Sequence, residues 1–166
     1  MKALGLGVLL LLFAQPAAAQ PVRGDGLVPA WPGHQRTAEV VSTATVAAAL
    51  ALDTVASWQE PVANRRHAFV MQGVREGVVF GSAWLVKRAV HRTRPCAPAC
   101  GIDSASSSFY SLHTAFAASS IGGPRLVFTI PLTTSTGYLR IAAGKHYLTD
   151  TIVGALVGAA AGRWLR

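Results

Sequence analysis

Residues 140–150 read Arg-Ile-Ala-Ala-Gly-Lys-His-Tyr-Leu-Thr-Asp. This stretch brings a cation, a histidine and a carboxylate within eleven residues. His146 and Asp150 are four residues apart, so they share a face if the segment is helical. A carboxylate at that spacing accepts the N–H of one ring nitrogen and leaves the other as a nucleophile or base. Arg140 adds a fixed cation, and Gly144 lets the backbone turn. The segment fits either a solvated helix face or a site for an anionic substrate, with phosphate as the first candidate.

The first 19 residues have the composition of a secretory signal peptide. Lys2 supplies a positive start, residues 4–14 form an apolar run, and Ala17 to Ala19 form a small-residue cleavage site. We expect cleavage before Gln20, with an uncleaved membrane anchor as the alternative. The protein is therefore expected to be exported and periplasmic, with inner-membrane association as the alternative. Residues 20–35, rich in Pro and Gly, are expected to form a leader or linker, and residues 36–166 a single domain.

The charge balance of the chain limits the classes of partner. Without Lys2 the chain keeps 14 basic residues against 7 acidic ones, a net charge of +7. Such a balance suits nucleic acid, an anionic membrane surface or a phosphate-bearing substrate. The basic residues are scattered or lie in one short run, Lys87 to Arg94, without interleaved aromatic residues, which argues against nucleic acid. A phosphate ester and a membrane surface remain the expected partners, and nothing in the sequence indicates the oligomeric state.

The two cysteines, Cys96 and Cys100, flank Pro98 in a segment without helical character. In an exported protein a close pair of this kind is most simply a small disulfide. A metal site would need two more ligands at suitable spacing, and the surrounding sequence offers none. We therefore predict a disulfide between Cys96 and Cys100 and no metal site.

The hydrophobic pattern predicts an all-α fold, a compact bundle of about five helices in the mature chain. The expected helices cover residues 36–58, 66–94, 111–121, 126–143 and 148–165. In the first of them the longest uncharged run, Val40 to Leu52, is shorter than the roughly 20 residues needed to cross a bilayer. It is therefore expected to be a packed helix of a soluble bundle. In the last helix Gly154, Gly158 and Gly162 form a stripe of small residues that allows another helix to approach closely.

Two further clusters carry groups suited to an oxyanion. Lys87 and Arg94 are seven residues apart, so within one helix they would share a face, with His91 between them. This segment fits either a clamp for oxyanions or a basic last turn that complements the helix dipole. Farther on, Ser111 is expected to cap a helix whose first N–H groups could bind an anion, and His113 could protonate a leaving oxygen. A plain capping serine beside an incidental histidine would read the same way.

In order and spacing, the three clusters resemble the motifs of the type 2 phosphatidic acid phosphatase (PAP2) superfamily, which includes bacterial class A acid phosphatases and vanadium haloperoxidases. The family's first motif, Lys, six residues and Arg-Pro, is matched fully by Lys87 to Pro95. Its second, Pro-Ser-Gly-His, is here Tyr110 to His113, which keeps the Ser and the His. Its third, Ser-Arg, five residues, His, three residues and Asp, lacks only the Ser, since Leu139 precedes Arg140. The resemblance covers about residues 66–162 and implies a helical bundle.

This resemblance implies a metal-independent phosphatase that hydrolyses a small monoester, or a lipid or isoprenoid phosphate, through a phosphohistidine. His146 would be the nucleophile, Asp150 would orient its ring, and His113 would protonate the leaving alcohol. The implied phosphate ligands are Lys87, Arg94, Arg140, the Ser111 hydroxyl and the backbone N–H groups of Ser111, Leu112 and His113. No cofactor is implied, and vanadate would act only as a phosphate mimic or as the cofactor of the haloperoxidase alternative.

Three departures from the family pattern fall beside these residues. Leu112 replaces a glycine and could crowd the phosphate, Tyr110 replaces a proline and could narrow the pocket or stack on a substrate, and Leu139 removes a hydroxyl donor. They motivate the alternative of a degenerate bundle that binds phosphate or lipid without turnover. A Ser-His-Asp hydrolase is disfavoured, because Ser111 and His113 are only two residues apart at a helix start and would point in different directions.

Overall fold

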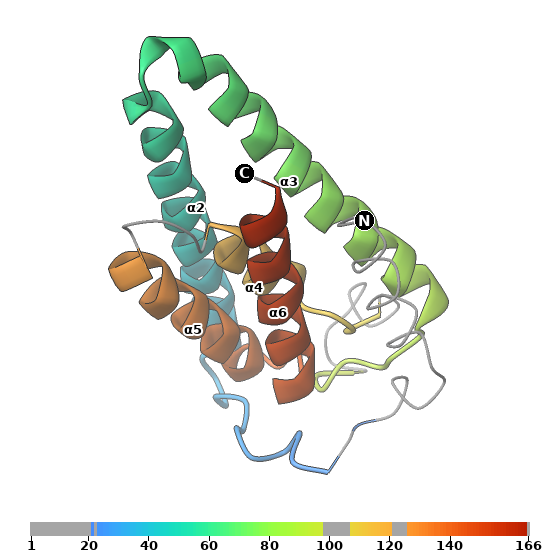
Figure 1. Ribbon diagram of the computed structural model, residues 1–166. Coiled ribbons are helices and arrows are strands. Elements are labelled where there is room, and N and C mark those ends of the chain that lie inside the picture. The colour runs from blue at the N-terminus through green and yellow to red at the C-terminus, as the bar shows by residue number, and fades with distance from the viewer. Residues whose placement is uncertain (1–20, 22, 98–106, 121–125, 166) are drawn as a thin grey trace.

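The computed structural model describes residues 21, 23–97, 107–120 and 126–165, and within these it contains five α-helices and no strand (Figure 1). The helices are α2 (Gln35–Gln59), α3 (Val62–Ala89), α4 (Leu112–Ser119), α5 (Leu126–Ala142) and α6 (Leu148–Trp164). The predicted all-α bundle of five helices is thereby confirmed. The predicted signal peptide lies outside the described residues.

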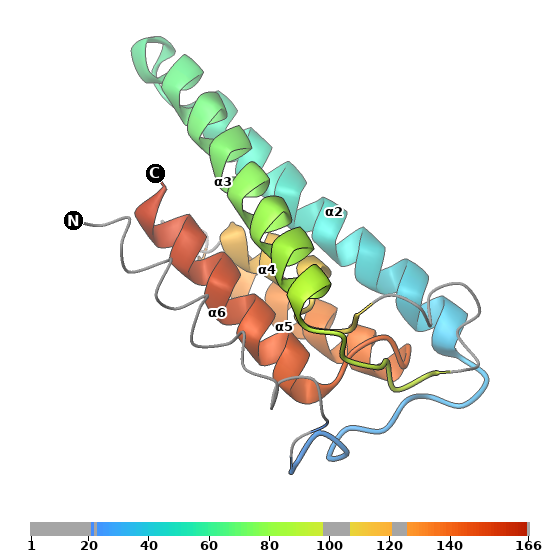
Figure 2. The same cartoon turned by 90° about the vertical axis from the view of Figure 1, so that its right-hand side faces the viewer.

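The short helix α4 lies inside the bundle and contacts the other four helices (Figure 2). Its approach to α6 is so close that the α6 glycines at the contact leave no room for a side chain of their own. A Cβ on Gly154 would lie 2.4 Å from the Ser111 carbonyl oxygen, and one on Gly158 would lie 2.0 Å from that of Ala115. The close helix contact expected at the glycine stripe of α6 is therefore present, and its partner is α4.

The largest hydrophobic core lies where α3, α4, α6 and the segment before α4 meet. Its buried members are Val79, Ala83, Val86, Val90, Phe109, Tyr110, Ala115, Val157 and Ala161. This core ties α4 to the α3 side of the bundle while the glycine contact ties it to α6. Because the start of α4 and the start of α6 carry two of the motif clusters, the same packing brings these clusters together.

Helices α2 and α3 form a long hairpin that extends beyond the other helices (Figure 1). Asp53 of α2 and Arg75 of α3 form an ion pair between them, and nearby the Ser57 hydroxyl donates to the Gln72 amide oxygen at 3.2 Å. In the described part of the chain, α2 is the one helix whose length and composition would suffice to cross a membrane. The expectation that this stretch is too short to do so counted only the residues before Asp53, whereas α2 continues through Asp53 to Gln59. The expected role as a packed helix of a soluble bundle stays a prediction.

The end of α3 also differs from the predicted one. The helix ends at Ala89, and Val90 is extended with φ −110° and ψ 100°. The following residues pair with the segment before α4: the Ser108 N–H donates to the Arg92 carbonyl at 2.9 Å, and the Arg92 N–H donates to the Ser107 hydroxyl at 3.2 Å. Long-range hydrogen bonds thus replace the last predicted turn of helix, and Arg94 does not share a helix face with residues of α3.

Candidate functional site

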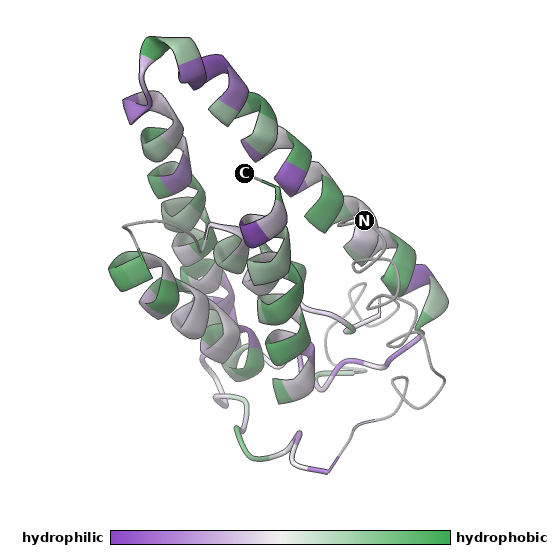
Figure 3. Ribbon diagram, viewed as in Figure 1, coloured by the Kyte–Doolittle hydropathy of each residue, from purple (hydrophilic) through white to green (hydrophobic). Residues whose placement is uncertain are grey.

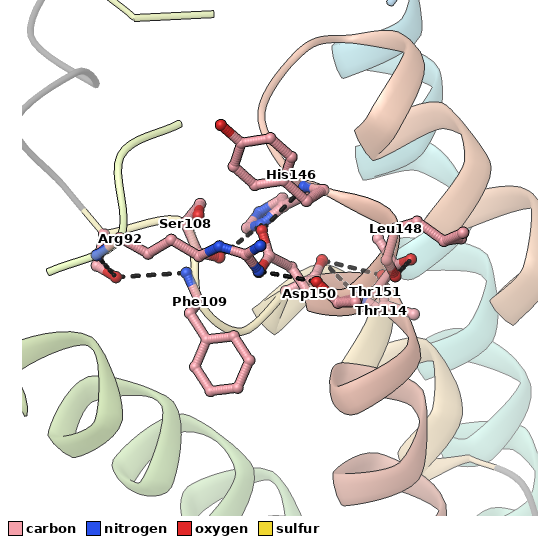
Figure 4. A network of polar contacts seen from close by, with 12 residues as sticks. Arg92, Ser108, Phe109, Thr114, His146, Leu148, Asp150 and Thr151 are labelled. Carbon is pink, nitrogen blue, oxygen red and sulfur yellow. Dashed lines mark hydrogen bonds and ion pairs between the residues drawn. The ribbon is translucent and has the colours of Figure 1, made fainter. Parts of the chain in front are cut away.

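His146 lies in the turn between α5 and α6 and is almost completely buried, with 3% of its surface exposed (Figure 4). Gly144 begins this turn with φ +69°, and its carbonyl accepts the Cys96 N–H at 2.9 Å. The Nδ1 atom of His146 is 2.7 Å from the Ser108 carbonyl oxygen. A carbonyl only accepts hydrogen bonds, so Nδ1 carries the proton of the neutral ring and Nε2 keeps its lone pair. The ring is therefore held in the tautomer that a nucleophile or base requires.

Asp150 lies behind this contact. Its Oδ2 is 3.7 Å from His146 Nδ1, too far for a hydrogen bond, and it accepts the Tyr147 N–H at 2.9 Å. The expectation that Asp150 directly accepts the ring proton therefore differs from the structure, in which the Ser108 carbonyl holds the ring. Asp150 is close enough to stabilise a positive charge that develops on the ring.

The three predicted phosphate ligands with positive charge come from three parts of the fold. Lys87, in the last turn of α3, donates from Nζ to the Ser107 carbonyl at 2.8 Å. Arg94 lies on the extended segment after α3, and Arg140, 4% exposed, lies in the last turn of α5. Although far apart in sequence, all three act electrostatically on His113. The fold therefore brings all three within electrostatic range of His113.

The start of α4 is capped as predicted. The Ser111 side chain accepts from the Thr114 N–H at 3.4 Å and from the Thr114 hydroxyl at 2.9 Å. The Ser111 N–H donates to the Asp150 carbonyl at 2.9 Å, so that N–H is not available to a phosphate as the resemblance implied. The N–H groups of Leu112 and His113 begin the helix without an intrahelical acceptor.

Both histidines are held neutral. Burial, together with the charges of Arg140, Arg94 and Lys87, lowers the pKa of His113 to about 4. Burial lowers the pKa of His146 to about 3, against the opposing influence of Asp150. In the ligand-free protein both rings are therefore unprotonated at neutral pH and surrounded by cations, which favours the binding of an anion between them.

The residues that replace the family pattern point into the core. Tyr110 is 1% exposed, its hydroxyl lies 2.8 Å from the Ser82 hydroxyl of α3, and burial raises its pKa to about 12. It therefore neither narrows a pocket nor stacks on a substrate. Leu112 packs against the same core, and Leu139 packs against the buried alanines Ala142 and Ala143.

Two charged residues of the site were missed by sequence reasoning. Arg92 is buried between Asp150 and Asp25, and forms an ion pair with each (Figure 4 shows the Asp150 contact). Arg92 lies within the first motif, but its place in a predicted helix hid its role. Asp25 could have been singled out in the sequence because it is the single acidic residue of the leader, residues 20–35.

The predicted disulfide lies at the border of the described residues. Cys96 is disulfide-bonded, while Cys100 lies outside them, so the pairing itself stays a prediction. No group of three or more His, Cys, Asp or Glu side chains within the described residues is placed to hold a metal ion.

Comparison with known proteins assigns the family. The family model described as the PAP2 superfamily matches residues 68–166, more than half of the chain. No curated protein and no solved structure matches the chain. The matched range contains the three motif clusters and four of the five described helices in whole or in part. The chain therefore belongs to the PAP2 superfamily.

Proposed function

We propose that the protein is a phosphatase that transfers a phosphoryl group from a phosphate ester to His146 and then to water. Nε2 of His146 attacks phosphorus, the bond to the ester oxygen breaks, and that oxygen takes a proton from His113. In the second half, the neutral His113 takes a proton from water, the water oxygen attacks phosphorus, and the bond to Nε2 breaks. Asp150, 3.7 Å from the ring, offsets the positive charge of the phosphohistidine.

The environment of His146 is the observation that supports this proposal most directly. A buried ring with Nδ1 committed to a carbonyl at 2.7 Å and a pKa of about 3 presents an unprotonated Nε2 over the whole physiological range. Lys87, Arg94 and Arg140 would neutralise the phosphoryl oxygens. Phosphoryl transfer depends mainly on positioning and charge stabilisation, so this arrangement requires no metal ion.

Protonation of His113 is the step that should set the pH dependence. Its pKa of about 4 means that the ligand-free protein holds it mostly neutral at pH 7. A bound phosphate dianion offsets the three cations and raises this pKa, but the acid form is still favoured at low pH. We therefore expect hydrolysis of a monoester to be faster at pH 5 than at pH 8.

The first experiment is release of inorganic phosphate from para-nitrophenyl phosphate by the full chain. His146→Ala should abolish release, and His67→Ala, at an exposed histidine near the start of α3, should leave it unchanged. An acid-labile, base-stable phosphoryl label that is lost in His146→Ala would identify the intermediate. A folded wild-type protein without turnover on phosphate esters between pH 4 and pH 9 would refute the proposal. Protection by phosphate in a thermal melt without turnover would instead support the binding-only alternative.

We further propose that the α2–α3 hairpin lies in a membrane. Between Ala68 and Lys87, every exposed residue of α3 is apolar. They are Val70, Gly73, Val74, Gly77, Phe80, Trp84 and Leu85. At 1.5 Å per residue these 20 residues extend about 30 Å, the thickness of the hydrocarbon core of a bilayer. Figure 3 shows hydrophobic segments along α3 interrupted by polar ones, with further polar residues at its turn with α2.

The exposed face of α2 has the same character. Between Glu39 and Gln59 its exposed residues are apolar except for two threonines. The hydroxyls of Thr43 and Thr54 donate to carbonyls of their own helix, at 3.1 Å to Glu39 and 2.9 Å to Leu50, so neither needs water. Of the charged residues in the middle of the hairpin, Asp53 and Arg75 pair with each other, and the half-buried Glu76 accepts from the Gln72 amide at 3.0 Å. Such pairing is what a low-dielectric surrounding requires.

At each end of the hairpin an arginine of α3 stacks on a tryptophan, Trp58 of α2 at the turn and Trp84 of α3 at the other end. The guanidinium of Arg65 lies 4.7 Å from the Trp58 ring centre at the hairpin turn, and that of Arg88 lies 4.0 Å from Trp84 at the other end. Tryptophan and arginine suit the headgroup region, where anionic phosphates meet the hydrocarbon. Lys87 adjoins Arg88, so the proposed active site lies at one headgroup level. We therefore propose a lipid-borne phosphate ester as the substrate.

Membrane fractionation tests this placement. Wild-type protein should stay with membranes after an alkaline carbonate wash and be released by detergent. Val74→Glu, in the middle of the apolar face, should reduce this retention, whereas Val62→Glu, 80% exposed at the hairpin turn, should not. Release of the wild type by carbonate would contradict the placement. Equal turnover of a long-chain lipid phosphate and a water-soluble monoester would contradict the substrate class alone.

A further inference from the structure

Arg92 lies between two carboxylates from distant parts of the chain. One guanidinium nitrogen pairs with Asp150, which is 58 residues away, and the other with Asp25, which is 67 residues away. The three side chains are 1%, 0% and 3% exposed for Arg92, Asp150 and Asp25, respectively. The face of the Arg92 guanidinium lies 4.5 Å from the Tyr147 ring centre. The guanidinium is thus fixed at its edges by charge and at its face by an aromatic ring.

Asp25 has a second task besides holding Arg92. Its Oδ1 accepts the Thr149 N–H at 3.1 Å and the Thr149 hydroxyl at 2.8 Å, while its Oδ2 accepts from Arg92. Thr149 lies in the first turn of α6, so the leader carboxylate satisfies a free N–H at the start of that helix. Both oxygens of Asp25 therefore face donors, and an amide in its place would have to turn its NH2 group toward one of them.

Arg92 also acts through its main chain on the residue that holds His146. Its carbonyl accepts the Ser108 N–H at 2.9 Å, and its N–H donates to the Ser107 hydroxyl at 3.2 Å. The carbonyl of the same residue, Ser108, accepts the hydrogen bond from His146 Nδ1. A single residue thus fixes both the acceptor of the His146 ring and the carboxylate behind it.

We infer that Arg92 and Asp25 are positioning residues for the reaction at His146, and that the leader segment is a structural part of the active site. Asp25 holds the guanidinium of Arg92 in place, and Arg92 holds Asp150 and the Ser108 carbonyl around the ring. With Asp25 present, the charge of Arg92 is shared between two carboxylates, so Asp150 keeps enough negative charge to stabilise a charged His146 ring. This inference rests on the phosphatase activity proposed above.

The test compares two substitutions that each remove one carboxylate from a buried Arg–Asp pair. Asp25→Asn affects the pair with Arg92, and Asp53→Asn affects the pair with Arg75, which joins α2 to α3 away from His146. Both variants should melt at a lower temperature than the wild type. Vanadate binding counts the intact sites, and kcat is expressed per site. Asp25→Asn should lower kcat per site by about 10-fold to 100-fold, whereas Asp53→Asn should change it by less than about 2-fold.

A thermodynamic cycle separates positioning from a general loss of structure. If Asp25 acts through Asp150, the Asp25→Asn substitution should change kcat per site by less than about 3-fold in an Asp150→Asn background. If the fold-losses of the two substitutions multiply in the double variant, the action of Asp25 through Asp150 is refuted. Equal effects of Asp25→Asn and Asp53→Asn on kcat per site would overturn the whole inference. Should Asp25→Asn fail to fold, Thr149→Val removes one donor to Asp25 and one acceptor of the Arg92 guanidinium without changing charge. In this variant kcat per site should fall with an unchanged inhibition constant for phosphate. An inactive wild type would refute the phosphatase proposal, whereas an active wild type with an unaltered Asp25→Asn variant would refute this inference alone.

Discussion

Gly158→Ala tests the contact on which the arrangement of the site depends. A Cβ at residue 158 would lie 2.0 Å from the Ala115 carbonyl oxygen and 2.9 Å from the Ala118 Cβ. The closest ordinary approach of carbon to a carbonyl oxygen is about 3.3 Å. Helices α4 and α6 would therefore have to separate by about 1.3 Å at this point. Because α4 also contacts α2, α3 and α5, it cannot move without opening gaps elsewhere.

The expected cost follows from these opposing effects. Overpacking of a core costs roughly 1–3 kcal/mol and more where the obstacle is backbone, while replacing Gly by Ala inside a helix gains about 1 kcal/mol. We expect a net destabilisation of about 3 kcal/mol, or a fall of about 9 °C in Tm for a domain of this size. Because α4 carries His113, a shift of about 1 Å should also lower kcat by roughly 100-fold.

Thermal melts followed by circular dichroism provide the measurement, with Gly77→Ala as the matched control. Gly77 lies in the middle of α3, and a Cβ there would meet nothing within 4 Å. This control should leave activity unchanged and raise the stability by about 0.5–1 kcal/mol. A Gly158→Ala protein that melts at or above the wild-type temperature would show that α4 and α6 are not in contact as described.

Two further outcomes are expected. Because the pKa values of His113 and His146 lie at about 4 and 3 in the folded protein, the unfolded chain binds more protons as the pH falls below 6.5, so stability should decrease with decreasing pH. Each ring should lower the free energy of unfolding by about 2 kcal/mol between pH 6.5 and pH 5. His113→Gln should make the pH dependence of the unfolding free energy less steep. An unchanged slope in this variant would contradict the low pKa of His113. Tyr110→Phe removes the hydrogen bond to Ser82 and should cost about 1 kcal/mol in a urea titration while kcat stays the same, since the hydroxyl points at α3; a large loss of activity would place Tyr110 at the substrate instead.

Local spacing explains what could be predicted about the fold. Apolar residues that recur every three to four positions predict helices, and Gly154 and Gly158 predict a close helix contact. Both predictions depend only on the geometry of a single helix. The end of α3 could not be predicted in this way. Segment 90–94 has no proline or glycine before Pro95, and it leaves the helix because Ser107 and Ser108 supply hydrogen bonds from outside it.

The candidate site shows the same division. The order and spacing of Lys87, His113 and His146 predict a phosphate site, which stays a prediction. The fold places charges from all three clusters within electrostatic reach of one another. The prediction that Asp150 directly accepts the ring proton followed from helical spacing alone. In the structure the Ser108 carbonyl takes that place, and a carbonyl of the main chain leaves no signal in the sequence.

The helical class, the identity of the candidate site residues and the order of the three motif clusters could be read from the sequence, since each follows from residue type and local spacing. The ion pairs of Arg92 with both Asp25 and Asp150, and the contact of the leader with the start of α6, depend on how the chain packs and could not be predicted from the sequence. A buried ion must find a partner of opposite charge, but burial is a property of the packed chain, and the partner is whichever carboxylate the fold brings within reach.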